Sequence, residues 1–213
     1  MFDTGIYLTI GTDFKTFKAH CGTQPDKGHV HPAFNQEKLQ DREIEGIWII
    51  GRSRSGEVIH TQAIRLIDLG KQTLPAHIAA NWSEFTLHGY NLDLEKTEIC
   101  MTSSAAQMTG RVTYHGELWL KGGPTGIRGG ATVILLTRLM LLLASERWAP
   151  DYMIGLQSPM AACRGLSTRE GYARCEQRSI LWYPKDGSDP IEDWLVWMSA
   201  EEASFNLRLP PEF

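Results

Sequence analysis

The chain has 213 residues, of which 42% are hydrophobic, so it is long enough to bury a sizeable core, and we expect a single domain over residues 1–213. The net charge is −4, which excludes the broad basic field that binds nucleic acid or an anionic membrane. Four scattered cysteines without a CxxC pair predict free thiols, and the absence of a secretory-signal pattern predicts a cytoplasmic protein.

Turn signals divide the first half into short elements without an obvious linker or repeat. An alternating apolar pattern predicts the strands, and Asp13 is a plausible cap for the first helix. In chain order we expect a strand at 6–12, a helix to about Cys21, a loop at 23–35, a helix at 36–44, a hairpin at 46–68 turning at 53–56, and a helix at 74–86; the pattern over 91–108 is ambiguous.

The second half contains a strand, a glycine-rich turn and a helix in direct succession, at 111–120, 121–131 and 131–144. The helix is apolar on all sides but too short to span a bilayer, which needs about 20 apolar residues, so we expect it to be buried in the protein. A strand at 151–157 follows through this crossover and is therefore expected to be parallel to the one before. The remaining expected elements are a helix at 159–169, a strand at 175–183, a helix at 190–203 and a closing strand at 205–209.

A strand, a glycine turn and a helix start together favour an anion site, because glycines let the backbone approach a ligand and unpaired N–H groups at a helix start attract phosphate. A Walker loop would need Gly-Lys-Ser/Thr where the chain has Gly129, Gly130 and Ala131, which argues against ATP hydrolysis. A dinucleotide fold would place its glycines near the start of a repeating βαβ series, whereas this turn follows antiparallel strands.

The segment 126–131, Gly-Ile-Arg-Gly-Gly-Ala, resembles the Gln/Arg-x-x-Gly-x-Gly/Ala turn of the GNAT superfamily of N-acyltransferases. It matches the last two fixed positions, while Gly126 replaces the polar first one. Segment 161–172 resembles the same family's short helix ending in a Gly-aromatic pair, here Gly171 and Tyr172. Element order agrees over about 43–183, and most strongly over 111–183.

This resemblance implies an α/β (α+β) fold with a mixed central sheet, antiparallel in its first half, whose parallel fourth and fifth strands splay around the cofactor between flanking helices. It also implies acetyl-CoA or another acyl-CoA as co-substrate, a small-molecule amine as acceptor, and no metal. The residues expected to contact the cofactor are Leu118, Trp119, Leu120, Gly126, Ile127, Arg128, Gly129, Gly130, Ala131 and Thr132.

For catalysis, a base must remove a proton from the amine and an acid must protonate the leaving thiolate. Glu117 and His115 are the candidate bases, and their spacing of two on one strand predicts that both project to the same face. Where the family commonly has a tyrosine as acid, this chain has Ser167. The sequence leaves several alternatives open: Ser167 or a water protonates the thiolate, Tyr172 or Tyr152 does so instead, or no acid is needed.

Two other functions stay open. Segment 61–68, with its Arg-Leu pair, resembles acyl-homoserine-lactone synthases, which take acyl chains from acyl carrier protein; related N-acyl amino acid synthases stand beside them. A non-catalytic domain that binds acyl-CoA or a protein partner is the third possibility, and a homodimer is conceivable. His20, His29 and His31 lie close in sequence, but we interpret them as scattered loop histidines and predict no metal site.

Overall fold

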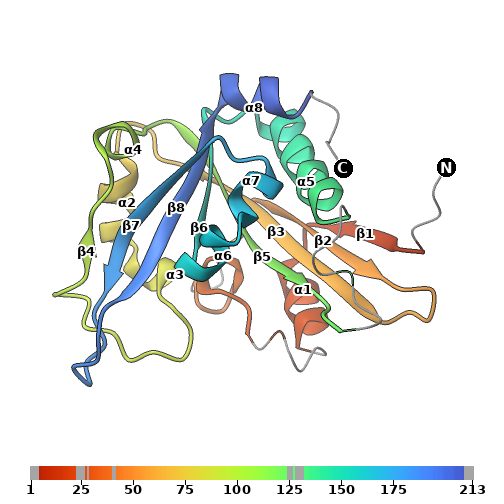
Figure 1. Cartoon of the computed structure of the whole chain (residues 1–213), viewed down its shortest axis with the longest axis horizontal. Helices are drawn as coiled ribbons and strands as arrows, with labels where there is room; N and C mark the ends of the chain where they lie inside the picture. The colour runs from red at the N-terminus through yellow and green to blue at the C-terminus, as the bar shows by residue number, and fades with distance from the viewer. Residues whose placement is uncertain are drawn as a thin grey trace.

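The computed structural model describes residues 5–22, 27, 29–39, 42–123, 127 and 132–208. Its strands all belong to one sheet with the order β1-β2-β3-β5-β6-β8-β7-β4 (Figure 1). The strands are β1 (Tyr7–Gly11), β2 (Gly46–Arg52), β3 (Val58–Asp68), β4 (Glu98–Ile99), β5 (Arg111–Leu120), β6 (Tyr152–Gln157), β7 (Arg174–Trp182) and β8 (Ile191–Ser199).

Helices cover both faces of this sheet (Figure 1). They are α1 (Phe14–Cys21), the 3-10 helix η1 (Pro32–Phe34), α2 (Leu74–Ala80), α3 (Trp82–Phe85), α4 (Ser103–Ala106), α5 (Thr132–Trp148), α6 (Pro159–Cys163), α7 (Leu166–Glu170) and α8 (Ala200–Asn206). Among the residues described, none of these helices is long and apolar enough to cross a membrane.

The sheet has the mixed topology expected from the sequence. β1, β2, β3 and β5 are antiparallel neighbours, whereas β5 and β6 are parallel and pair over Val112–His115 and Tyr152–Gly155. Beyond β6, the strands β8, β7 and β4 are again antiparallel. The predicted fold class is therefore confirmed, including the parallel pair that follows the crossover through α5.

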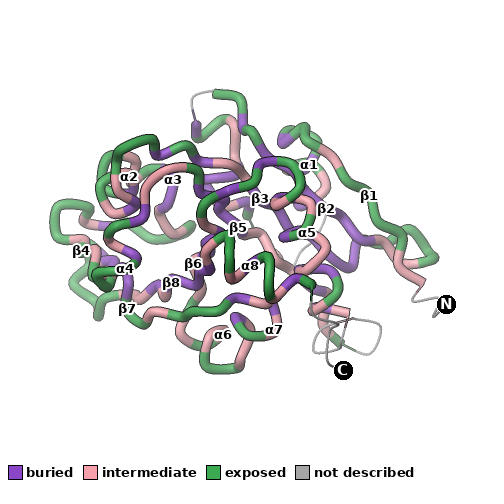
Figure 2. The backbone as a smooth tube through the Cα atoms, turned by 90° about the horizontal axis from the view of Figure 1, so that it is seen from above, coloured by how far each residue is buried: buried purple, intermediate pink, exposed green. Residues whose placement is uncertain are grey.

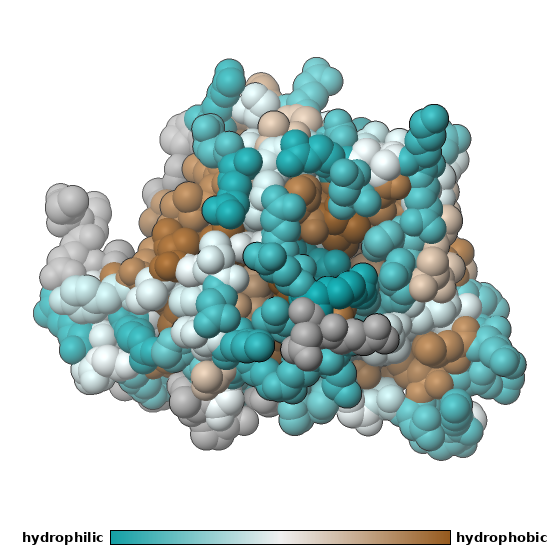
Figure 3. Space-filling model, turned by 180° about the vertical axis from the view of Figure 1, so that it is seen from behind, coloured by the Kyte–Doolittle hydropathy of each residue, from teal (hydrophilic) through white to brown (hydrophobic). Residues whose placement is uncertain are grey.

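Alternation along the strands divides the core into two layers, because successive side chains point to opposite faces of a sheet. On one face, α1, η1, α2 and α3 cover a cluster that includes Phe34, Tyr114 and Trp182. On the other face, α5 and α8 cover a cluster that includes Ile64, Met140 and Tyr172. Figure 2 shows buried backbone through the middle of the sheet and the exposed edge strand β1. Figure 3 shows the opposite side to Figure 1, where hydrophobic patches lie among hydrophilic residues.

Three helix or strand predictions are wrong. Residues 36–39 form turns and not a helix. The segment predicted as a helix at 190–203 is mostly the strand β8, and the predicted closing strand at 205–209 overlaps the end of α8. β8 lies between β6 and β7 with both faces covered, so its run from Leu195 to Met198 is continuously apolar and lacks the alternation that marks a half-buried strand.

Two expected helices are each broken in the middle. The helix predicted at 74–86 is divided into α2 and α3 at Asn81, whose φ of −128° is not helical. The helix predicted at 159–169 is divided into α6 and α7 at Gly165, whose φ of 72° lies in the left-handed region that glycine adopts without strain. The second break redirects the chain toward the site described below.

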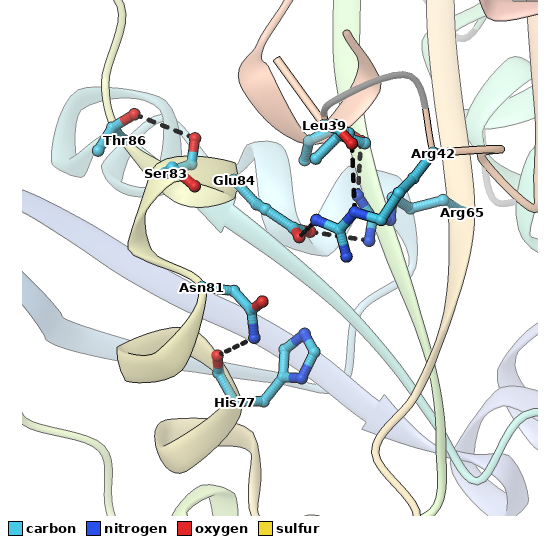
Figure 4. Close-up of polar contacts among 9 residues, drawn as sticks. Leu39, Arg42, Arg65, His77, Asn81, Ser83, Glu84 and Thr86 are labelled. Atoms are coloured by element: carbon cyan, nitrogen blue, oxygen red, sulfur yellow. Dashed lines mark hydrogen bonds and ion pairs between the residues drawn. The ribbon is translucent and has the colours of Figure 1, made fainter. Parts of the chain in front are cut away.

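A buried carboxylate fastens α3 to the sheet (Figure 4). Glu84 of α3 forms ion pairs with Arg65 of β3, at 2.9 Å, and with Arg42, which lies between η1 and β2. Arg65 also donates to the carbonyl oxygen of Ala33, and Arg42 to that of Leu39. Glu84 is only 2% exposed, so this network compensates a buried charge and ties three chain segments together.

Candidate functional site

The parallel strands β5 and β6 separate at their carboxyl ends. Their ladder stops at His115 and Gly155; β6 continues only beside β8, and β5 continues only beside β3 as far as Leu120. A cavity of about 300 Å³ lies at this divergence. Residues of β5, β6, α6 and α7 line it, together with Lys27 from the N-terminal region. The resemblance implied that these two strands separate. They do so, and a cavity lies between them.

A bulge in β5 decides which side chains face the cavity. The register with β3 slips between Thr61 and Ala63, and Glu117 has a φ of 60°, which is uncommon for a residue other than glycine. The hydroxyl of Thr61 donates to the carbonyl oxygen of Glu117 at 3.0 Å and supports this conformation. Side chains of a regular strand point alternately to the two faces of the sheet. The bulge shifts this alternation by one residue, so Glu117 points to the opposite face from the one that a regular strand would give it.

As a result, His115 and Glu117 point to opposite faces of the sheet, and the prediction that they share a face is wrong. The His115 ring contacts Gln62 and Tyr172 on the face covered by α5 and α7. The Glu117 carboxylate contacts Lys27 and His31 on the face covered by α1 and η1. Both residues nevertheless line the cavity, because it reaches through the gap between the strands.

Both ring nitrogens of His115 are occupied. The Gln62 amide nitrogen donates to the carbonyl oxygen of Leu136 at 2.6 Å, which leaves the Gln62 oxygen to accept from His115 Nε2 at 3.3 Å. His115 Nδ1 is then the acceptor facing the Tyr172 hydroxyl at 3.2 Å. Burial lowers the pKa of His115 to about 4, so the ring is neutral at pH 7. This arrangement suits an orienting residue better than a base.

Glu117 is held from the other side of the sheet. Its carboxylate accepts from the Lys27 ammonium group at 2.5 Å and from the backbone N–H of His31 at 2.6 Å. The side chains of Lys27 and Glu117 are only 5% and 4% exposed. An ion pair enclosed to this degree lies largely outside bulk water, where electrostatic interactions are stronger than on a surface.

Glu170 is a cavity residue that sequence reasoning missed. It is the last residue of α7 and is 3% exposed. Like Leu166, four residues earlier in the same helix, it lines the cavity. The Gln157 amide donates to its carboxyl group, but burial raises the pKa of Glu170 to about 8. A carboxyl group with this pKa is mostly protonated at pH 7. Its one sequence signal is the i, i+4 spacing from Leu166, which places both on one helix face.

The alternative acids predicted from the sequence lie in different places. Ser167 is buried and hydrogen-bonds to the Cys175 thiol, and it is absent from the cavity lining. Tyr152 packs against Trp197 in the core cluster that also contains Phe34 and Trp182. Tyr172 does line the cavity, with its hydroxyl beside His115 Nδ1 and the carbonyl oxygen of Ile154. Of these three residues, only Tyr172 is brought to the cavity.

The residues expected to contact the cofactor are only partly described. Leu118 and Trp119 line the cavity. Leu120 packs with Val133 and Leu136 of α5, and Ile127 packs against the same cluster. Thr132 is the first residue of α5, so the helix starts directly after the predicted turn. Gly126, Arg128, Gly129, Gly130 and Ala131 lie outside the described residues.

In the described part of the chain, no three His, Cys, Asp or Glu side chains gather to form a candidate metal site. The His29 ring lies against the His88 ring, tilted by 31° and with 3.4 Å between the ring centroids, and the His31 ring lies beside Tyr114. These contacts are packing contacts between rings and do not converge on one point.

No protein-family model and no curated protein matches the chain. Solved structures that resemble it include FeeM, an N-acyl amino acid synthase from uncultured soil microbes (13% identity, 94% of each chain covered, TM-score 0.49). An N-acetyltransferase from Staphylococcus aureus has 9% identity over 92% of this chain and 98% of that one, with a TM-score of 0.48. The aminoglycoside acetyltransferase AAC(6')-Ib, in complex with coenzyme A and kanamycin, has 13% identity over 94% and 98%, with a TM-score of 0.46.

Proposed function

We propose that the protein is an N-acyltransferase that moves an acyl group from an acyl thioester of coenzyme A to a primary amine. The observation that carries this proposal is the open edge of β5 beside a cavity that contains one ion-paired carboxylate, Glu117, and one carboxyl group with a raised pKa, Glu170. Two carboxyl groups in such different environments suit the two proton transfers of amide formation.

The donor would lie along β5. Past His115, residues 116–119 of β5 have no ladder with β6 in the described part of the chain. An extended chain containing amide groups, such as the pantetheine arm, can pair with such an edge as an added strand does. The start of α5 after the glycine turn suits the pyrophosphate, because unpaired N–H groups at a helix start attract anions.

The reaction itself needs little from the protein, because a thioester is already activated. Glu117 accepts a proton from the ammonium group of the acceptor, and the free amine attacks the thioester carbonyl carbon. The C–N bond forms, the C–S bond breaks, Glu170 donates its proton to the departing thiolate, and the second proton of the amine nitrogen passes to the Glu170 carboxylate, which restores the acid. His115 stays neutral and orients the Tyr172 hydroxyl in the cavity wall.

A thermal-shift comparison of acetyl-CoA, longer acyl-CoAs and acyl carrier protein tests the donor. A ligand that binds only the native state adds about 2.7 kcal/mol of stability at a hundred times its dissociation constant. The variant Ala161→Trp fills the cavity from α6, and the matched control Cys163→Trp changes an exposed residue of the same helix outside the cavity lining. We expect acyl-CoA to stabilise the native protein and Cys163→Trp, but not Ala161→Trp. Equal shifts in both variants would place the donor elsewhere.

A further inference from the structure

Lys27 lines the cavity in which the acyl donor is proposed to bind. Its Nζ lies 2.5 Å from Glu117 Oε2, the carboxylate proposed as the base. Lys27 lines the same cavity as Leu118, Trp119 and Glu170. A primary amine therefore lies beside a proton acceptor, at the place where an acceptor substrate would have to lie.

This lysine differs from the other ion-paired lysines in its surroundings. Lys18 makes an ion pair of the same length with Glu37, but the two side chains are 41% and 66% exposed. Lys121 pairs with Glu57 at 2.6 Å and is 25% exposed. An exposed pair of this kind contributes little to stability, and a buried one is retained at a desolvation cost that a hydrophobic pair would avoid. The enclosed Lys27–Glu117 pair thus calls for a reason beyond stability.

We propose that Lys27 is an internal acyl acceptor, so that the protein acylates its own Lys27 Nζ from the bound thioester. This inference rests on the proposed function. Glu117 takes one proton from the Lys27 ammonium group, and the nitrogen attacks the thioester carbonyl carbon. The C–N bond forms, the C–S bond breaks, and the thiol of coenzyme A and one proton are released. The products are an amide at Lys27 and free coenzyme A.

Acylation would change the site as well as mark it. The amide has no charge, so the ion pair with Glu117 is lost while the His31 N–H bond to the carboxylate remains. Glu117 is then available to a second amine. The first turnover on Lys27 is therefore separable from later turnovers on a free acceptor.

The test is incubation of the purified full chain with acetyl-CoA, followed by peptide mass spectrometry that compares acetyl occupancy at Lys27 and Lys18. Lys18 is the internal control for non-enzymatic acetylation, because it has the same ion-pair chemistry outside the cavity. We expect faster acetylation at Lys27 than at Lys18, by at least tenfold in initial rate, or about 1.4 kcal/mol. We also expect Glu117→Gln to remove this preference and to leave the Lys18 rate unchanged.

Equal rates at the two lysines, or a Lys27 rate unaffected by Glu117→Gln, would overturn the inference. Acetyl-CoA binding is measured in parallel by thermal shift. Binding together with acetylation of a free amine, but without modification of Lys27, defeats this inference and leaves the proposed function standing. Absence of any coenzyme A binding defeats both.

A second variant keeps the inference testable if Glu117→Gln fails to fold. Lys27→Ala removes the amine and leaves room beside Glu117 for propylamine added to the solution. We expect this variant, with acetyl-CoA, to form N-propylacetamide faster than the native chain does, because the added amine takes the place of the missing side chain. A rate no higher than that of the native chain contradicts the placement of the acceptor amine at Lys27.

Discussion

Glu117 and His115 are two positions apart on β5 and yet contact opposite faces of the sheet. The bulge at Glu117 turns its carboxylate toward Lys27 and His31, while His115 stays beneath α5 and α7 with Gln62 and Tyr172. The two candidate bases are therefore no relay pair. They have separate environments, and their separate contributions are measurable.

Glu117→Gln keeps the shape, but it has one acceptor oxygen in place of two, so it retains at most one of the contacts to Lys27 and His31, and it cannot accept a proton. We expect turnover of an amine acceptor to fall by about 10²–10⁴-fold, as is typical for loss of a general base, with coenzyme A binding retained. The measurement is kcat and the coenzyme A dissociation constant for the same preparation.

The comparison variant is His115→Gln. Both of its ring nitrogens are in hydrogen bonds inside the core, so we expect it to lower stability and to reduce turnover less than Glu117→Gln does. A larger loss of turnover in His115→Gln, in a folded protein, would reverse the assignment of the base.

Glu170 predicts a pH dependence of stability. Its pKa is about 8 in the native protein and 4.5 in the unfolded chain, so between these values the native state holds a proton that the unfolded state has released. The contribution of Glu170 to the free energy of unfolding is therefore fully present at pH 4.5 and below, and it is lost as the pH rises to about 8. Over this range the free energy of unfolding falls by at most about 1.4 kcal/mol per pH unit. Glu170→Gln should abolish this slope.

The informative window is pH 6.5 to 8. The buried histidines His31, His60 and His115 have pKa values lowered to about 4 from 6.5, so they add stability as the pH rises, but only below pH 6.5. Urea unfolding at several pH values in this window isolates Glu170. The same slope in native protein and Glu170→Gln would show that another group is responsible.

The glycine turn carries a third prediction, from the sequence. Gly129→Asp places a side chain and a negative charge where the pyrophosphate is proposed to approach the backbone. We expect coenzyme A to bind at least about tenfold more weakly, a loss of about 1.4 kcal/mol, with the unfolding temperature of the free protein little changed. Calorimetric titration measures this. Native affinity in the folded variant would remove the turn from the donor site.

The fourth prediction concerns the network of Figure 4. Glu84→Gln leaves Arg65, a largely buried guanidinium group, without its compensating charge, and we expect a loss of about 3 kcal/mol in the free energy of unfolding. Glu37→Gln breaks an exposed ion pair and serves as the control, which we expect to unfold at the native urea midpoint. Equal midpoints in both variants would mean that Arg65 finds another partner.

The order of elements was predictable where a local pattern decides the structure. The alternating strand at 111–120, the all-apolar helix after the glycines and the parallel strand behind it follow from periodicity and from crossover geometry. β8 was not predictable in this way, because burial on both faces removes the alternation on which strand prediction depends.

The site was less predictable, since it depends on contacts between residues far apart in sequence. Glu117 meets Lys27 across 90 positions, and the bulge that turns it arises from the pairing of β5 with β3. Glu170 resembles any helical surface glutamate in the sequence, and only the packing of α7 against the cavity buries it. Ser167, placed by analogy at the acid position, is directed toward Cys175 for the same reason.

The short ladder between β5 and β6 also has a consequence for folding. In the described residues, these four residue pairs form the strand ladder that joins the half of the sheet containing β1, β2 and β3 to the half containing β8, β7 and β4. Cooperative units often coincide with such groups of strands, so amide hydrogens in the two halves are expected to exchange in two blocks with different opening energies. Because residues of both halves line the cavity, we expect a molecule bound there to make the two groups of amides exchange together.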